Sequence, residues 1–142
     1  MKIIIPIEPR TKKNSQRIIR VHGKPIIVPS KQYKDYEKAC MGYIDDTDRK
    51  KIDYPVNVKC AFYMGTRRKC DLTNLLEAID DILVKSEVLA DDNYSIIESH
   101  DGSRVYYDNE FPRTVVEIRR IKDDRLRNIP KSKKNVPGRK KV

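Results

Sequence analysis

Runs of β-branched and other aliphatic residues predict strands in the first half of the chain. Residues 2–5 form the opening run, and residues 17–21 and 24–28 form two more that are joined by a short His-Gly turn, as in a β-hairpin. Over residues 56–63, apolar and polar positions alternate, which predicts a strand with one buried face.

Two segments change to the three- and four-residue spacing of an amphipathic helix. The first starts after Ser30, which stands in the N-cap position, and is expected to end near residues 42–45. Its apolar side chains are Tyr33, Tyr36, Cys40, Tyr43 and Ile44. The second starts after Asp71, and its apolar side chains are Leu72, Leu75, Leu76, Ile79, Ile82 and Leu83. We assign the three tyrosines of the first helix to packing rather than to stacking on nucleic-acid bases.

The last regular patterns indicate where the folded part ends. Residues 104–107 and 114–121 predict two further strands, and apolar periodicity stops beyond Lys122. We therefore expect one α+β domain over residues 1–122, in which two main helices pack on a small mixed sheet. Residues 123–142 form a basic tail that we expect to lack fixed structure until it meets a polyanion.

Length and composition allow one folded domain and exclude several classes of protein. The chain has 142 residues, of which 37% are charged and 38% hydrophobic. Its longest apolar runs are a few residues, against roughly 20 for a membrane span, and no leader precedes the first strand, so we expect a cytoplasmic protein with no membrane partner. The three cysteines are an odd number and widely spaced, so we expect them to be reduced structural thiols. Because the chain has only two histidines, we expect any metal ion to be held by oxygen ligands.

Charge is strongly segregated along the chain. Eight of the ten net positive charges lie within residues 125–142, whereas residues 71–98 hold eight acids and one base. Basic residues flank this acidic segment: Arg10, Lys12, Lys13, Arg17, Arg20, Lys24, Arg67, Arg68 and Lys69. A nuclease needs this arrangement, because cations neutralise DNA phosphates while carboxylates hold a metal ion against the scissile one. A solvated helix face is the simpler explanation of any single charge run, but not of the combination.

Asp71 and Asp92 are the carboxylates best placed to hold such an ion. Asp71 begins the second helix and the Asp91-Asp92 pair follows its end, so an antiparallel return of the chain would bring them together. Mg²⁺ prefers oxygen ligands and keeps several waters from which a nucleophile can come. An ordinary helix cap at Asp71 and a solvated turn at Asp91-Asp92 remain open alternatives. The residues alone indicate a metal-dependent phosphoryl-transfer enzyme without naming its substrate.

Three stretches of the sequence are similar to those of one known nuclease family. The main one is DLTNLLEAIDDIL at 71–83, followed by VLADD at 88–92. The others are PRTKKNS at 9–15 and PSKQY at 29–33. These stretches resemble the RusA family of Holliday junction resolvases. The resemblance extends over most of residues 1–122 and looks most like versions carried by bacteriophages and prophages. The resemblance implies a homodimeric α+β endonuclease in a bacterial cell, which uses Mg²⁺, or Mn²⁺ in its place, to nick four-way DNA junctions.

The resemblance also assigns roles to individual residues. Asp71 and Asp92 match the family's first and last essential aspartates, and both are expected to be catalytic metal ligands. Asp91 is a candidate second ligand. Asn74 and Asp81 match the family's recurrent asparagine and later helix aspartate, and are expected to support the site or the helix.

Two positions depart from the family pattern. Thr73 stands where the family often has an aspartate, and Glu77 stands where it often has a lysine. Thr73 offers only a neutral hydroxyl, and Glu77 replaces a cation that could stabilise the transition state by an anion that could ligate metal. Either Glu77, one turn beyond Thr73, takes over the missing carboxylate as a catalytic residue, or activity is reduced. We favour the first.

Basic residues near the site are expected to contact backbone phosphates and to read junction shape more than base sequence. The expected DNA-binding residues are Lys12, Lys13, Asn14, Arg17, Arg67, Arg68 and Lys69. Surface solubility explains each of the N-terminal cations equally well when it is taken singly. Because resolving a junction takes two symmetric nicks, a C2 homodimer with two identical sites is expected.

Two other functions remain open. The first is a junction-binding or branched-DNA-binding dimer of the same fold with weak or no catalysis, which Thr73 and Glu77 permit. Cleavage that depends on Mg²⁺ distinguishes it from a resolvase. The second is an RNA-binding or ribosome-associated protein whose basic tail supplies the affinity, so that deleting residues 125–142 abolishes nucleic-acid binding.

Overall fold

The computed structural model describes residues 1–12 and 16–122 of the chain. Its elements are β1 (Lys2–Ile5), β2 (Gln16–Val21), β3 (Lys24–Pro29), α1 (Lys31–Gly42), the 3-10 helix η2 (Asp46–Asp48), β4 (Val56–Met64), α2 (Leu72–Lys85), β5 (Ile97–Ser99), β6 (Arg104–Tyr107) and β7 (Arg113–Arg120). All the predicted helices and strands are confirmed, and the short elements η2 and β5 had no predicted counterpart. None of the helices within the described ranges is long and apolar enough to cross a membrane. The basic tail predicted for residues 123–142 lies outside the described residues.

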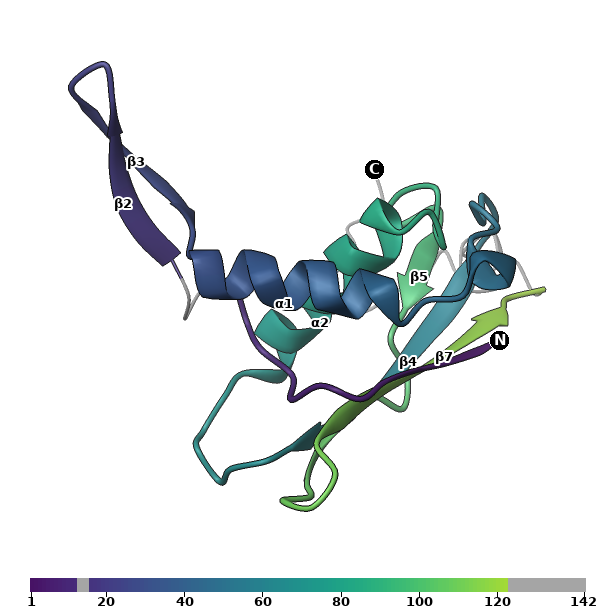
Figure 1. Cartoon of the computed structure of the whole chain (residues 1–142). Helices are drawn as coiled ribbons and strands as arrows, with labels where there is room; N and C mark the ends of the chain where they lie inside the picture. The colour runs from purple at the N-terminus through teal and green to yellow at the C-terminus, as the bar shows by residue number, and fades with distance from the viewer. Residues whose placement is uncertain (13–15, 123–142) are drawn as a thin grey trace, which may run out of the picture.

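β4 and β7 form the centre of a mixed sheet (Figure 1). β7 pairs antiparallel with β1 on one side and with β4 on the other, so that Ile3, Val116 and Cys60 lie in register across the sheet. β5 and β6 both pair parallel with the other edge of β4. The described residues thus form a five-stranded sheet in which both strand directions occur, which confirms the predicted α+β class.

Side-chain hydrogen bonds of Asn57 connect β4 to the end of β5 and to the segment between β5 and β6. The Oδ1 atom of Asn57 accepts hydrogen bonds from the Ser99 hydroxyl at 2.6 Å and from the Asp101 amide at 2.8 Å. Its Nδ2 donates to the Asp101 carbonyl at 3.2 Å. Gly102 follows with φ of +87°, a conformation that favours glycine. This segment is therefore held firmly against β4, and His100 lies within it.

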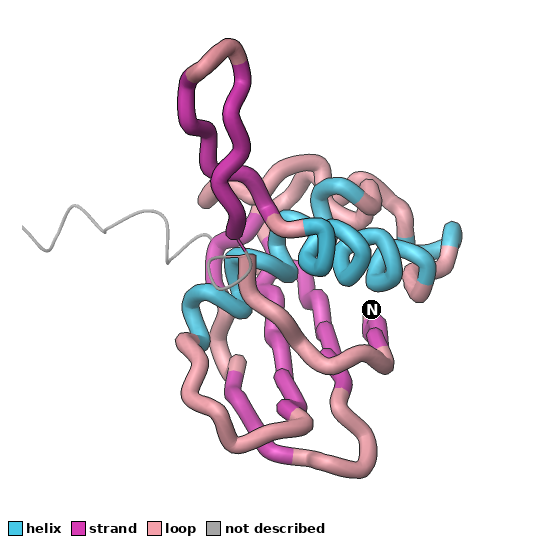
Figure 2. Tube along the Cα trace, turned by 60° about the vertical axis from the view of Figure 1, so that its left-hand side comes forward, coloured by secondary structure: helices cyan, strands magenta, loops and turns pink. Residues whose placement is uncertain are grey.

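α1 and α2 pack on one face of the sheet (Figures 1 and 2). The Ser30 hydroxyl caps α1 by accepting a 3.1 Å hydrogen bond from the Tyr33 amide, as predicted. Tyr33 and Tyr36 are buried, which confirms their packing role. The same prediction is wrong for Tyr43, which is 52% exposed, because α1 ends at Gly42 and Tyr43 no longer follows the buried face. The residues that α2 buries are Leu75, Ala78, Ile79, Ile82 and Leu83.

β2 and β3 form a separate hairpin that projects from the body (Figures 1 and 2). Ile18 lies opposite Ile27 and Ile19 lies opposite Ile26. Ile18 is 70% exposed and Ile27 is 65% exposed. The predicted hairpin is confirmed, but the described part of the chain leaves these aliphatic side chains uncovered.

Candidate active site

The first turn of α2 presents Asp71 without using its side chain as a cap. Asp71 occupies the N-cap position, yet its carboxylate makes no capping hydrogen bond. Instead, Oδ2 of Asp71 accepts a solvent-exposed bond of 3.3 Å from Nδ2 of Asn74. The alternative of an ordinary side-chain cap is therefore wrong, and Asn74 contacts the aspartate that it was expected to support.

A cavity of about 280 Å³ lies between α2 and the segments that follow it. Thr73, Glu77 and Asp80 line it from α2, at spacings of four and three residues that place them on one helix face. Asp92 lines it from the turn after α2, and His100 lines it from the segment after β5. Three carboxylates from two segments therefore adjoin one cavity. Thr73 and Glu77, the two departures from the family pattern, both lie in its wall.

Asp91 shapes the turn that carries Asp92. Its Oδ1 accepts a 2.7 Å hydrogen bond from the Asp92 amide, and its Oδ2 accepts a 3.1 Å bond from Nδ2 of Asn93. These bonds lower the pKa of Asp91, whereas desolvation and the adjacent Asp91 carboxyl raise the pKa of Asp92. The alternative of a solvated turn is therefore correct for Asp91, whose carboxylate bonds within the turn. The same turn, however, places Asp92 in the wall of the cavity. A ligand role for Asp91 stays a prediction.

Asp80 and His100 form a hydrogen-bonded pair in the cavity wall. The His100 Nδ1 atom lies 2.8 Å from the Val58 carbonyl oxygen, and because a carbonyl only accepts, Nδ1 carries a proton. Its Nε2 lies 2.9 Å from Oδ2 of Asp80. Burial raises the pKa of Asp80, although His100 opposes that shift. Burial alone lowers the pKa of His100, but the hydrogen bond and charge of Asp80 outweigh it, so the net shift is upward.

The donors around the cavity suit a hard cation. Asp92, Glu77 and Asp80 offer carboxylate oxygens, and Oδ1 of Asp80 is buried with no hydrogen-bond partner in the described part of the chain. Across residues 1–12 and 16–122, no three acidic, histidine or cysteine side chains converge into a ready metal cage. Mg²⁺ is commonly held by one or two carboxylates together with water and substrate phosphates, so it does not need such a cage. Asp71 precedes this cavity along α2 and is not among its lining residues.

Two of the predicted DNA-binding cations make contacts within the protein. Nζ of Lys12 lies 3.5 Å from Oδ2 of Asp81, which ties the N-terminal segment to α2. The guanidinium of Arg67 lies 4.0 Å from the ring centre of Tyr107, a cation–π contact. The pairing with Lys12 gives Asp81 a supporting contact on the helix.

The other predicted DNA-binding residues have different positions. Arg17 is exposed on β2, and Arg68 and Lys69 line a second cavity before α2. Lys13 and Asn14 lie outside the described residues. DNA contact by all of these residues stays a prediction.

Sequence reasoning missed two residues of the cavity, Asp80 and His100. Asp80 had a detectable signal, because it follows Glu77 by three residues and so continues the polar face of the helix. His100 had none, because its position depends on Asn57 holding the segment after β5 against β4.

A protein-family model described as endodeoxyribonuclease RusA matches residues 6–119. The chain belongs to the RusA family. The crossover junction endodeoxyribonuclease RusA of Aquifex aeolicus (strain VF5) is 28% identical to it over 91 residues, which cover 64% of this chain and 71% of the relative. These matches confirm the resemblance to RusA-family Holliday junction resolvases and the predicted enzyme class, a crossover junction endodeoxyribonuclease.

Proposed function

We propose that this RusA-family chain hydrolyses phosphodiester bonds at four-way DNA junctions with Mg²⁺ held by Asp71 and Asp92. The position of Asp92 carries the proposal, because the turn after α2 places it in a cavity that Glu77 also lines. The family model supplies the reaction class, and the name of the Aquifex relative supplies the junction substrate.

The chain's own residues have distinct roles in this proposal. Asp71 and Asp92 hold the ion, and Asn74 and Asp91 keep those two carboxylates in place. When bound, Mg²⁺ supplies a Lewis acid and a water of lowered pKa. The carboxylates repel DNA phosphates, so neutralising them by mutation is expected to leave junction binding intact or stronger while cleavage is lost.

We propose that Glu77 replaces the carboxylate that is missing at Thr73. Both residues line the cavity with Asp92, one helical turn apart. Glu77→Gln keeps the size of the side chain and removes its charge, so we expect it to raise the Mg²⁺ concentration needed for half-maximal nicking about tenfold. An unchanged Mg²⁺ requirement would show that Glu77 takes no part in holding the ion.

We extend the proposal to a C2 homodimer that makes paired symmetric nicks. One chain provides one such site, and a four-way junction presents two equivalent strands. The exposed aliphatic side chains of β2 and β3 favour contact with a further chain, because an isolated two-stranded hairpin is only marginally stable in water. The family resemblance is also the basis for proposing a cytoplasmic enzyme of phage or prophage origin.

The test is nicking of a labelled synthetic four-way junction beside a linear duplex of the same sequence. Wild type is compared with Asp92→Asn in Mg²⁺, in Mn²⁺ and in EDTA. Glu117→Gln is the matched control, because it removes an exposed carboxylate from β7, outside the cavity. We expect paired nicks in the junction from wild type and from Glu117→Gln, and junction binding without nicks from Asp92→Asn.

Three outcomes contradict parts of this proposal. Nicking in EDTA would remove the metal ion from the mechanism. Loss of junction binding in Asp92→Asn would make Asp92 a structural residue. Junction binding by wild type without any nicking would favour the alternative of a binding dimer that has lost catalysis.

A further inference from the structure

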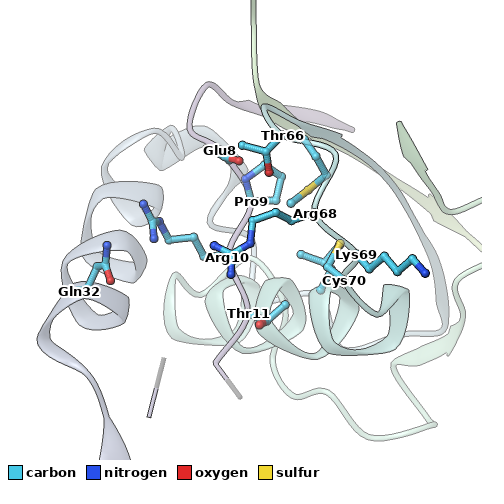
Figure 3. A pocket seen from close by; sticks show the side chains of 11 residues that line it. Glu8, Pro9, Arg10, Thr11, Gln32, Thr66, Arg68, Lys69 and Cys70 are labelled. Atoms are coloured by element: carbon cyan, nitrogen blue, oxygen red, sulfur yellow. The ribbon is translucent and has the colours of Figure 1, made fainter. Parts of the chain in front are cut away.

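A second cavity, of about 460 Å³, lies beside the start of α2 (Figure 3). Its walls come from the segment after β1, from α1, from the end of β4 and from the segment that leads into α2. Cys70 lines it and directly precedes Asp71, so the cavity adjoins a proposed metal ligand. Its volume lies within the range of roughly 300–1,000 Å³ that is typical of small-molecule sites.

The cavity combines an apolar surface with three cations and one carboxylate, that of Glu8. Met64 and Cys70 are half-buried and supply accessible apolar surface, and the buried Pro9 and Leu75 pack behind them. Arg10 and Arg68 are exposed. Figure 3 shows the Arg68 side chain extending across the cavity toward Arg10, whereas Lys69 points away.

Neither of these two guanidinium groups is engaged by the protein. Within residues 1–12 and 16–122, the side chains of Arg10 and Arg68 form no ion pair and no hydrogen bond. By contrast, Arg113 bonds Asp108 at 2.8 Å, and Arg49 donates to backbone carbonyls. Two guanidinium groups without a partner among the described residues suit an anion with several oxygens, such as a phosphate, because each guanidinium can donate two parallel hydrogen bonds to it.

We propose that this cavity holds one unstacked nucleotide of the DNA strand next to the cleaved bond. The base lies against the half-buried side chains of Met64 and Cys70, and its phosphate lies between Arg10 and Arg68. The inference rests on the proposed function, and it adds a residue-level site for recognising the DNA around the cut. Unstacking costs least where base pairing is already interrupted, as at the branch point of a junction.

The polar group best placed to read the base is the Gln32 amide, which lines the cavity from α1. An amide offers both a donor and an acceptor to a base edge. The nucleotide in this cavity would therefore set any base preference of cleavage, while the phosphate contacts elsewhere follow junction shape.

The experiment places single 2-aminopurine residues at successive positions around the branch point, because this base brightens when it unstacks. The full chain is added in EDTA at low salt, so binding is followed without cleavage. We expect fluorescence at one position to rise severalfold with wild type. The double variant Arg10→Gln/Arg68→Gln is expected to lose that rise. Arg104→Gln, which removes an exposed arginine of β6 outside the cavity, is expected to retain it.

Cys70 provides a second readout that needs no substitution. It is half-buried in the cavity wall, whereas Cys40 and Cys60 are buried. We expect bound junction to slow alkylation of Cys70 at least fivefold and bound linear duplex to slow it much less. Equal protection by the two DNAs would contradict an unstacked nucleotide in the cavity.

The outcomes separate this inference from the proposed function. Junction binding with no fluorescence rise at any position overturns the nucleotide site and leaves Mg²⁺-dependent nicking untouched. Weaker binding by the double variant with an unchanged fluorescence rise makes Arg10 and Arg68 general phosphate contacts, which also overturns it. A fluorescence rise lost only in the double variant supports the site even if wild type does not nick. Absence of junction binding by wild type overturns both proposals.

Discussion

Asn57 is the side chain on which the placement of His100 depends most directly. It is 5% exposed, and its amide joins β4 to the segment after β5 through three hydrogen bonds, to Ser99 and to both backbone groups of Asp101. Replacing it by alanine removes all three bonds. The backbone groups of Asp101 are then left without these partners beside β4.

The expected loss of stability follows from the number of hydrogen bonds that the substitution removes. A hydrogen bond contributes about 1 kcal/mol net, and more when its removal leaves a buried group unsatisfied, so Asn57→Ala is expected to cost about 3 kcal/mol of unfolding free energy. For a domain of this size, that corresponds to a fall in melting temperature of about 10 °C. Ser99→Ala removes one of the three bonds and is expected to cost about 1 kcal/mol.

Urea unfolding followed by far-UV circular dichroism measures both costs. Asn109→Ala is the matched control, because Asn109 is exposed and the same substitution there is expected to change stability by less than about 0.5 kcal/mol. Below its melting temperature, Asn57→Ala is also expected to nick junctions more slowly, because His100, which pairs with Asp80 in the wall of the candidate active site, loses its fixed position. A loss at Asn57 no larger than that at Asn109 would refute the claim that these side-chain bonds hold the segment.

Three further predictions use groups elsewhere in the domain. Thr114→Val is expected to stabilise the protein by about 1 kcal/mol in urea unfolding, because the buried Thr114 hydroxyl has no hydrogen-bond partner among the residues that the structure describes, and a loss of stability would contradict this. The fold raises the pKa of Asp80 above its ordinary value of 3.8 and the pKa of His100 above its ordinary value of 6.5. Each group therefore contributes stability at a pH below its ordinary pKa, and that contribution is lost as the pH rises above it. His100→Gln should therefore flatten the decline in unfolding free energy above pH 6.5, and an unchanged slope would argue against the pair. Ellman's reagent should titrate Cys70 first, since the buried Cys40 has its pKa raised to about 11, and fast reaction of all three thiols would contradict the burial.

Most helices and strands could be predicted because they arise from the spacing of apolar residues that are close together in the sequence. In α2 the apolar residues recur at helical spacing, and in β4 they alternate, so each pattern specifies one element and its buried face. β5 was missed because it is three residues long, too short for a pattern. Tyr43 was misplaced because helical spacing continues past Gly42 in the sequence but not in the backbone.

The candidate site could be predicted only in part. Asp71 and Asp92 stand out in the sequence, and the structure shows that Asp71 leaves its carboxylate free of capping and that Asp92 lines a cavity. Spacing alone does not distinguish Asp91 from Asp92, because the two are adjacent and chemically identical, and only the family resemblance singled out Asp92. Their difference arises from the turn, in which the Asp92 amide binds Asp91.

The sequence by itself determined all the longer helices and strands, the family and the segregation of acidic from basic residues, because each of these depends on neighbours along the chain. Tertiary structure alone decided that Glu77, Asp80 and Asp92 share one cavity and that His100 reaches Asp80. It also decided which arginines bond to other groups of the protein and that Arg10 and Arg68, at the second cavity, have no partner among residues 1–12 and 16–122. These arrangements depend on how β4, α2 and the later segments pair and pack over long separations, and a local pattern of residues does not specify such contacts.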